Sequence, residues 1–208
     1  MEKPLLIFDF DGTIVDSLDA SISILNKLAK KHGVWGRLNR TTYREMMHRS
    51  ITENFRYFKI PLAKLPFLMS EFKNEFEKSR KSVKLVPGVK TVLKKLAKKC
   101  ELIIVTSNHS ELAKKIMEKN GLSKEFSQII GSNKEKKKFD ALKKYRKRFP
   151  DRKIFYIGDT SADIREAKQA KVISVAVAWG FQSIESIKRQ KPDYVVNSPN
   201  GLLKATLK

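Results

Sequence analysis

Cysteine is nearly absent from this chain of 208 residues, which contains only Cys100. A single thiol excludes an internal disulfide and any metal site that is built from several cysteines. Because Cys100 directly precedes an apolar run, a buried structural thiol is a better interpretation than a reactive one. Cys100 therefore gives no indication of a redox function.

Long hydrophobic runs are also missing. No apolar stretch approaches the roughly 20 residues that a membrane-spanning helix needs, and the early apolar run, Leu5 to Phe8, is too short for a signal peptide. With 41% hydrophobic and 32% charged residues, the chain can form one sizeable core and a small accessory domain. We expect a globular, cytoplasmic protein without a membrane partner.

Acidic residues are few in comparison with basic ones. Asp and Glu total 22 and Lys and Arg total 44, which gives a formal net charge of +22. Such an excess attracts polyanions and anionic substrates in general. Most lysines occupy solvent-type positions of helical patterns, as in residues 90–99, so a solvated surface is the favoured interpretation. A nucleic-acid surface is the alternative.

Short apolar runs, mostly separated by amphipathic segments, predict an α/β fold. The runs that are typical of buried parallel strands are residues 5–8, 102–105, 154–157 and 172–177, and weaker candidates are 128–130 and 194–196. We predict a Rossmann-like core of three layers around a parallel sheet of five or six strands.

The pattern changes between Ser17 and Lys84, where only helical periodicity is found. The dipeptide Pro87-Gly88 then predicts the end of an extended linker and the start of a helix. We therefore predict a core domain of residues 1–16 and 85–208, with a small all-helical domain of residues 17–84 inserted after the first strand.

Two acids follow the first predicted strand, in the sequence Asp9-Phe10-Asp11-Gly12-Thr13. Ligands of open α/β sheets bind at the carboxyl ends of the strands, so both acids should face a ligand. Because side chains at i and i+2 of an extended segment point the same way, Asp9 and Asp11 should project together. Their repulsion predicts either a divalent cation or a proton on one acid. The alternative is that both only cap the following turn.

A second acidic pair, Asp159 and Asp163, follows Gly158 at the end of another predicted strand. The spacing of four residues lets the first turn of a helix return Asp163 to the side of Asp159. Hard oxygen ligands from separate strand ends suit Mg²⁺, which binds through one or two carboxylates plus substrate phosphate. The alternative for Asp159 is an ordinary helix cap. We predict Mg²⁺ as the cofactor.

Groups that can bind an anion follow a third strand and precede a later helix. Thr106, Ser107 and Asn108 offer hydroxyls, an amide and backbone N–H groups at a predicted turn from strand to helix, which is a typical anion site but also an ordinary cap. A lysine at the start of the helix after residue 135 could contact a phosphate oxygen and a carboxylate. Lys136, Lys137 and Lys138 are the candidates, and the pattern does not choose between them.

In order, placement and residue type, these four segments resemble the motifs of the haloacid dehalogenase superfamily of phosphatases, and the resemblance covers the whole chain. The helical insertion resembles the small cap of the phosphoglycolate-phosphatase-like branch. The segments 86–89 and 179–181, Val-Pro-Gly-Val and Trp-Gly-Phe, resemble connectors of that branch.

The resemblance implies that Asp9 is the nucleophile that forms an aspartyl-phosphate, and that Asp11 protonates the leaving oxygen and then activates water. It implies Mg²⁺ ligation by Asp9, by the backbone carbonyl of Asp11 and by Asp159. Asp163 would support this site. The dehalogenases of the superfamily lack the second acid, so Asp11 argues against cleavage of a carbon–halogen bond.

The resemblance also implies that phosphoryl oxygens are bound by Thr106, by the turn at Ser107 and Asn108, and by a lysine, for which we choose Lys138. In related caps a specificity loop lies near the position of residues 43–50, so His48 and Arg49 are candidate substrate contacts. A salt-bridged surface arginine is the commoner explanation of such a residue.

Three functions remain after these considerations. The first is a Mg²⁺-dependent phosphatase of a small anionic phosphate monoester, of the phosphoglycolate, sugar phosphate or nucleotide type. The second is a phosphatase of nucleic-acid ends, which the charge of +22 favours. The third is a non-catalytic basic binding module on the same fold, against which Asp9 and Asp11 argue.

Overall fold

The computed structural model describes residues 2–79, 83–135 and 137–207. The chain divides into two compact units. The first, called the core domain here, is formed by Met1–Asp16 and Lys84–Lys208. The second, called the helical domain, is formed by Ser17–Val83.

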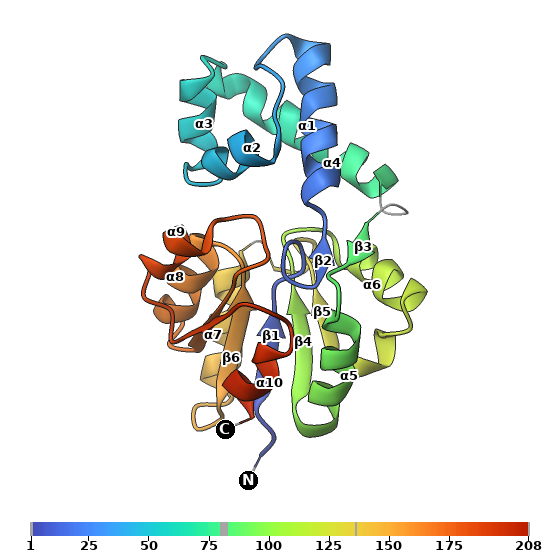
Figure 1. The fold of residues 1–208 in the computed structure, drawn as a ribbon, viewed down its shortest axis with the longest axis vertical. Helices are drawn as coiled ribbons and strands as arrows, with labels where there is room; N and C mark the ends of the chain where they lie inside the picture. The colour runs from blue at the N-terminus through green and yellow to red at the C-terminus, as the bar shows by residue number, and fades with distance from the viewer. Residues whose placement is uncertain (1, 80–82, 136, 208) are drawn as a thin grey trace. The chain divides into compact units, whose positions relative to one another are not determined.

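The core domain is built on a parallel sheet of six strands in the order β5-β4-β1-β6-β7-β8. Figure 1 shows β5, β4, β1 and β6 side by side. The strands are β1 (Leu5–Phe8), β4 (Glu101–Val105), β5 (Gln128–Ile130), β6 (Ile154–Gly158), β7 (Ile173–Val177) and β8 (Tyr194–Val196). The predicted α/β fold is confirmed, and both weaker strand candidates belong to the sheet. Their apolar runs are continuous because both faces of such a sheet are covered by helices.

Alternation along the strands separates the two faces of the sheet. Leu5 and Ile7 join a buried cluster with residues of α7 (Lys138–Arg148) and α8 (Ser161–Gln169). Leu6 and Phe8 are equally buried and point to the opposite face. There α5 (Val89–Lys99) contacts β4 and α10 (Gly201–Thr206). The other described helices of this domain are α6 (Ser110–Lys119), η2 (Ser123–Glu125) and α9 (Ile184–Lys188).

The register of the central strands places several loop starts at one edge of the sheet. Phe8 at the end of β1 is paired with Ile104 of β4 and with Ile157 of β6. The chain segments that follow these three parallel strands therefore leave the sheet side by side, and the segments after β1 and β6 carry the predicted acids.

The entry to and exit from the helical domain form a short antiparallel pair of strands, β2 (Val15–Asp16) and β3 (Lys84–Leu85). After β3, Gly88 has a φ of 83° and is the N-cap of α5, as the Pro87-Gly88 signal predicted. The left-handed conformation explains why glycine is suitable at this position.

The helical domain contains α1 (Leu18–His32), α2 (Arg40–Met46), α3 (Ile51–Tyr57), η1 (Leu62–Lys64) and α4 (Leu65–Ser79). Helices α1 and α4 pack together, and the ion pairs Lys27–Glu75 and Lys31–Glu71 join them at the surface. A small apolar cluster around Phe55, Ile60 and Leu68 forms part of its interior.

Two expectations from composition can be compared with the structure. Cys100 is 3% exposed, which agrees with a buried structural thiol. In the part of the chain that the structure describes, no helix is both long and apolar enough to span a membrane. The cytoplasmic location stays a prediction.

Candidate active site

Asp9 is the first residue after β1 and is only 6% exposed. Its backbone N–H donates to the carbonyl of Ile157 at 2.8 Å, which ties the end of β1 to β6. The carboxylate accepts a hydrogen bond from the N–H of Phe10 at Oδ1, at 2.7 Å, and Oδ2 lies 2.8 Å from Nζ of Lys138. Burial raises the pKa of Asp9 well above its ordinary value, and the Lys138 charge opposes this rise.

Lys138 begins helix α7, and its ammonium lies between two carboxylates. Nζ is 2.8 Å from Oδ2 of Asp9 and 3.0 Å from Oδ1 of Asp163. Burial acts to lower the pKa of Lys138, but the charges of Asp163 and Asp9 raise it well above the ordinary value, so the amine is protonated. Of the three candidate lysines, Lys137 is exposed at the N-cap of α7, and Lys136 lies outside the described residues.

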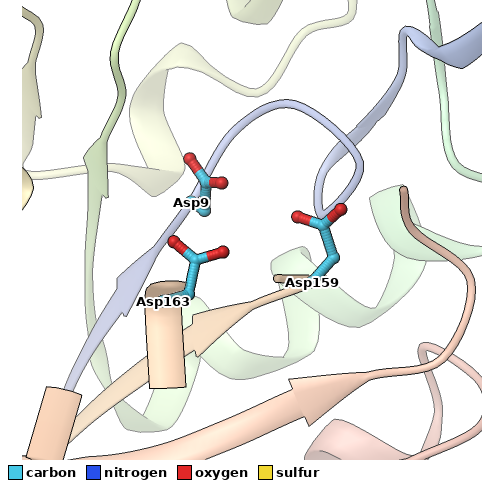
Figure 2. Close-up of side chains that lie close together, drawn as sticks. All are labelled: Asp9, Asp159 and Asp163. Atoms are coloured by element: carbon cyan, nitrogen blue, oxygen red, sulfur yellow. The ribbon is translucent and has the colours of Figure 1, made fainter. Parts of the chain in front are cut away.

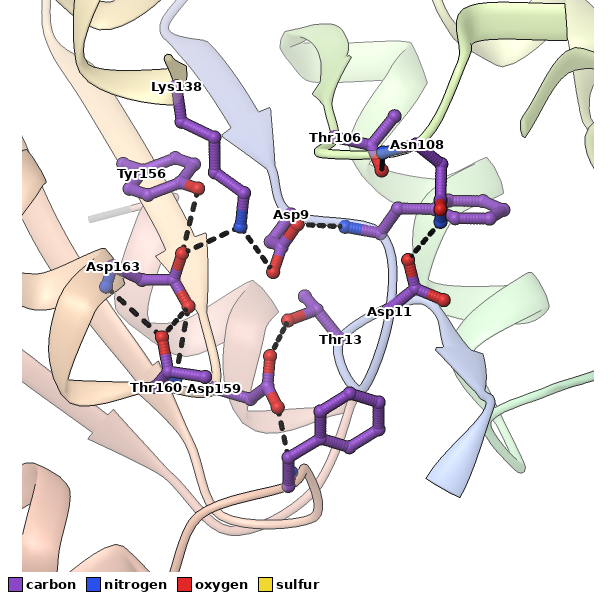
Figure 3. A network of polar contacts seen from close by, with 12 residues as sticks. Asp9, Asp11, Thr13, Thr106, Asn108, Lys138, Tyr156, Asp159, Thr160 and Asp163 are labelled. Atoms are coloured by element: carbon purple, nitrogen blue, oxygen red, sulfur yellow. Dashed lines mark hydrogen bonds and ion pairs between the residues drawn. The ribbon is translucent and has the colours of Figure 1, made fainter. Parts of the chain in front are cut away.

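Asp163 is held by four hydrogen bonds that occupy both oxygens (Figure 3). Oδ1 accepts from Lys138 and from the hydroxyl of Tyr156, each at 3.0 Å. Oδ2 accepts from the backbone N–H of Thr160 at 3.0 Å and from its hydroxyl at 2.6 Å, within the capping box that starts α8. Burial acts to raise the pKa of Asp163, but the Lys138 charge and these hydrogen bonds hold it below its ordinary value.

Asp159 follows β6 and is completely buried. Its oxygens accept hydrogen bonds from the Thr13 hydroxyl at 3.1 Å and from the N–H of Phe181 at 2.7 Å. These donors are neutral. Burial, with the nearby charge of Asp163, therefore raises the pKa of Asp159 to about 7.

Two glycines leave room for the Asp159 carboxylate. A Cβ at Gly12, whose φ is +74°, would lie 2.2 Å from Oδ2 of Asp159. A Cβ at Gly180 would lie 2.1 Å from Cβ of the same residue. Any larger side chain at either position would displace this acid, so both loops are shaped around it.

Three carboxylates could bind a divalent cation together. Asp9, Asp159 and Asp163 each offer one oxygen, and these oxygens lie within 4.8 Å of one another (Figure 2). Hard oxygen donors fit a divalent metal of the magnesium type, and such an ion would offset the cost of ionising the buried Asp159. Each Asp163 oxygen accepts two hydrogen bonds, whereas each oxygen of Asp9 and Asp159 has one such partner among the described residues. Asp9 and Asp159 therefore keep more capacity to bind a metal, and Asp163 suits a supporting position.

Asp11 lies away from Lys138 and the two carboxylates that contact this lysine (Figure 3). Its Oδ2 accepts a hydrogen bond from the side-chain amide of Asn108 (Figure 3), and Asp11 is bridged to Val15 in the backbone. The two acids of the first motif therefore contact different partners, Asp9 a lysine and Asp11 an amide. The expectation that alternation along a strand makes them project together does not describe them, because β1 ends at Phe8 and both acids lie beyond it.

The predicted phosphate-binding turn connects β4 to α6. Thr106 is buried, and its hydroxyl accepts a hydrogen bond from the N–H of Asn108 at 3.1 Å. Ser107 is exposed, and Asn108 is half-buried. The amide contact from Asn108 to Asp11 joins this turn to the loop after β1.

The predicted specificity residues lie in the helical domain. His48 and Arg49 follow α2, and both are exposed. The Arg49 guanidinium stacks on the ring of Tyr57, 4.1 Å from its centre, which is an aromatic contact. Their role toward a substrate stays a prediction.

Three residues of the site were not singled out from the sequence. Thr13 and Thr160 lie within the quoted acidic motifs, where their hydroxyls resemble ordinary turn or cap groups. Tyr156 lies in an apolar run that predicts a buried strand, and only its phenolic oxygen, a polar group inside such a run, could have drawn attention to it.

Comparison with known proteins identifies a family model and relatives that match this chain. The family model described as haloacid dehalogenase-like hydrolase matches residues 6–177. A phosphoglycolate phosphatase of Synechococcus elongatus is 28% identical over 203 residues, which cover 96% of this chain and 95% of the relative. A relative from Caldanaerobacter subterraneus named "Putative pyrophosphatase PpaX" is 29% identical over 221 residues, which cover 98% and 94%.

A solved structure supports the fold. The haloacid dehalogenase-like family hydrolase SP0104 from Streptococcus pneumoniae has a TM-score of 0.82 at 22% identity, and the match covers 98% of each chain. The matched family model covers most of this chain, including the acids after β1 and β6. The chain therefore belongs to the haloacid dehalogenase-like hydrolase family and is a phosphatase of that family.

Proposed function

We propose that this phosphatase depends on Mg²⁺ and hydrolyses a small phosphate monoester through an aspartyl-phosphate on Asp9. The observation that carries the proposal is the position of the Lys138 ammonium between Asp9 and Asp163, beside the buried Asp159. A protonated lysine on a buried carboxylate holds a nucleophile in place and offers positive charge to an incoming phosphoryl group.

The first step would be attack by a carboxylate oxygen of Asp9 on phosphorus. The bond from Asp9 to phosphorus forms, and the bond from phosphorus to the leaving alcohol oxygen breaks. Asp11 donates its proton to that oxygen, so the alcohol leaves neutral. The hydrogen bond from Asn108 keeps the Asp11 carboxyl oriented while it acts.

The second step would be hydrolysis of the aspartyl-phosphate. Asp11, now ionised, accepts a proton from water as the water oxygen attacks phosphorus. The bond from phosphorus to Asp9 breaks, which releases inorganic phosphate and restores both acids. One carboxyl therefore serves as acid and then as base.

The phosphoryl oxygens would be bound by Lys138, Thr106 and the turn at Ser107 and Asn108. The turn precedes the N-terminus of α6, where backbone N–H groups and the helix dipole favour an anion. Mg²⁺, held by Asp9, the backbone carbonyl of Asp11 and Asp159 with Asp163 in support, would supply further positive charge against the phosphoryl oxygens.

For the substrate, we propose a small anionic monoester of the phosphoglycolate, sugar phosphate or nucleotide type. The name of the Synechococcus relative supports phosphoglycolate within this class. His48 and Arg49 are proposed to contact the part of the substrate that leaves. A preference for nucleic-acid ends is the second candidate, which only the net charge of +22 favours.

The central test is release of phosphate from p-nitrophenyl phosphate. We expect activity with Mg²⁺, loss of activity with a chelator, and loss of activity in Asp9→Asn at any Mg²⁺ concentration. Asp151→Asn is the matched control, because it makes the same change at an exposed position of the core domain. Activity that survives in Asp9→Asn would contradict the assignment of the nucleophile.

A substrate panel separates the two candidate functions. Phosphoglycolate, sugar phosphates and nucleotides would be compared with 3′- and 5′-phosphorylated oligonucleotides at two salt concentrations. We expect the small monoesters to have the higher kcat/KM at both. A strong preference for oligonucleotides that weakens with salt would support the second candidate instead.

A further inference from the structure

Tyr156 is a core residue with one polar group. Its side chain is fully buried and belongs to the apolar cluster that β1, β4 and β6 form with α7. The hydroxyl leaves this cluster and donates to Oδ1 of Asp163 at 3.0 Å (Figure 3). A phenylalanine would fill the same core volume, so packing does not explain the hydroxyl.

The oxygen that Tyr156 contacts is shared with the ammonium of Lys138. Oδ1 of Asp163 accepts both donors at 3.0 Å, while Oδ2 is held by Thr160. Lys138 is at the same time 2.8 Å from Oδ2 of Asp9. The ammonium is therefore shared by two carboxylates. Of the two oxygens that contact it, Oδ1 of Asp163 alone also accepts a hydrogen bond from a hydroxyl in the part of the chain that the structure describes.

A donated hydrogen bond reduces the negative charge that a carboxylate oxygen presents to its other partners. The Tyr156 hydroxyl therefore weakens the hold of Asp163 on Lys138 and leaves more of the ammonium to Asp9 and to an incoming phosphoryl group. It also restricts Oδ1 to one direction, since a second donor fixes the carboxylate plane.

We propose that Tyr156 is a positioning residue of this phosphatase, which acts through Asp163 to set how Lys138 is shared between Asp163 and Asp9. The inference rests on the proposed function of Asp9 and Lys138. The phosphoryl oxygens need the lysine most in the transition state. We therefore expect loss of the Tyr156 hydroxyl to lower kcat more than it weakens binding of the intact substrate.

The test begins with Tyr156→Phe and the matched control Tyr145→Phe. Tyr145 lies on α7 with Lys138, and its hydroxyl also donates a hydrogen bond. The acceptor is Gln128 and not Asp9, Asp159 or Asp163. We expect kcat to fall about tenfold in Tyr156→Phe with a change in KM below about threefold, on the scale of one hydrogen bond to a charged group. Tyr145→Phe should keep the wild-type kcat.

Two inhibitors distinguish positioning from a general structural effect. Orthovanadate adopts the five-coordinate geometry of phosphoryl transfer, and orthophosphate resembles the product. We expect Tyr156→Phe to weaken inhibition by vanadate about as much as it lowers kcat, and to leave inhibition by phosphate nearly unchanged. Equal weakening of both would overturn the inference, because a loosened site would affect them alike.

A double-mutant cycle with Asp163→Asn tests the route of the effect. If Tyr156 acts through Asp163, its substitution should cost much less in the Asp163→Asn background than in the wild type. Equal losses in both backgrounds, or a wild-type kcat in Tyr156→Phe, would overturn the inference. Asp9→Asn is assayed in parallel: its activity tests the proposed nucleophile, so a failure of the proposed function is seen separately.

Discussion

The core domain and the helical domain hold their charged residues in opposite ways. In the core, Asp9, Asp159 and Asp163 are 6%, 0% and 1% exposed, and Lys138 lies between two of them. In the helical domain, the ion pairs of α1 with α4 lie at the surface, with lysine side chains 66% and 58% exposed. Buried charges interact strongly and are costly to leave unpaired, whereas exposed pairs contribute little.

Exposed apolar side chains differ as well. Ile51, Tyr57, Leu62 and Phe67 of the helical domain are large and exposed, while the exposed large hydrophobics of the described core lie on β8. The comparison teaches that the core domain buries charge at strand ends, where the proposed chemistry would take place. The helical domain instead offers accessible side chains, and its selection of the substrate stays a proposal.

The largest expected effect is that of removing the buried cation. Lys138→Met leaves Asp9 and Asp163 without the ammonium between them, so we expect kcat to fall by about a thousandfold or more and the free energy of unfolding to fall by about 3–5 kcal/mol. Phosphate release and urea unfolding measure these changes. Lys137→Met, at the exposed neighbouring position, is the control and should change neither.

Two glycines with positive φ sharpen the comparison between the domains. Gly12→Ala combines a left-handed backbone with a Cβ 2.2 Å from Asp159, so we expect a Mg²⁺ affinity about 10- to 100-fold weaker, in addition to lower stability. Gly33, at the end of α1, has a φ of +62°, and a Cβ there would have no neighbouring atom within 4 Å. We therefore expect Gly33→Ala to lower the free energy of unfolding by only about 1 kcal/mol. Calorimetric titration measures the Mg²⁺ affinity of both variants, and thermal unfolding measures their stability. Equal effects of the two substitutions would show that Gly12 matters only for its backbone.

The pH dependence of the metal-free protein tests the buried charge on Asp159. Its folded pKa of about 7 lies above the unfolded value, so between about pH 4 and pH 7 the folded state binds a proton that the unfolded chain has lost. The contribution of Asp159 to the stability of the wild type therefore falls as pH rises through this range. We expect Asp159→Asn to gain about 2–4 kcal/mol relative to wild type between pH 4 and pH 8 in urea unfolding.

Saturating Mg²⁺ provides the control for this prediction. If the ion neutralises Asp159 in the wild type, the gain of Asp159→Asn at pH 8 should disappear or reverse when Mg²⁺ is added. A pH-independent difference between the two proteins would contradict the burial of a charged carboxylate at this position.

The smallest effect is expected at the surface of the helical domain. Hydrogen bonds from Lys27 and Lys78 lower the pKa of Glu75 to about 2. Its stabilising contribution is therefore present above the ordinary glutamate value and is lost as pH falls toward about 2. We expect Glu75→Gln to lower the thermal midpoint slightly at pH 7 and not at pH 2. Glu77→Gln, on the same helix, is the control, and added salt should reduce the difference.

Much of the fold could be predicted because it depends on local patterns. Four continuous apolar runs identified the central strands, and the change to helical periodicity after Ser17 identified the insertion. The position of Asp9 and Asp159 directly after strands also follows from the sequence, since parallel strands bring their carboxyl ends to one edge.

The contacts between these segments could not be predicted in the same way. Lys137 and Lys138 are adjacent and chemically equal in the sequence, and only the start of α7 and its packing on the sheet bring Lys138 to Asp9. The hydrogen bond from the Asn108 amide to Asp11 joins residues of two different motifs. The hydroxyl of Tyr156, which donates to Asp163, belongs to a residue inside an apolar run. Neither contact could be predicted from a local pattern.

The sequence by itself determined the type of fold, the order of the motifs and the acids at the strand ends, because hydrophobic periodicity and the connectivity of parallel strands act over short distances along the chain. The tertiary structure alone decided which lysine is shared, which acid is held by four hydrogen bonds and at which acid burial disfavours the ionised form. Those properties depend on burial and on distances of about 3 Å between residues that are far apart in sequence, and no local pattern contains them.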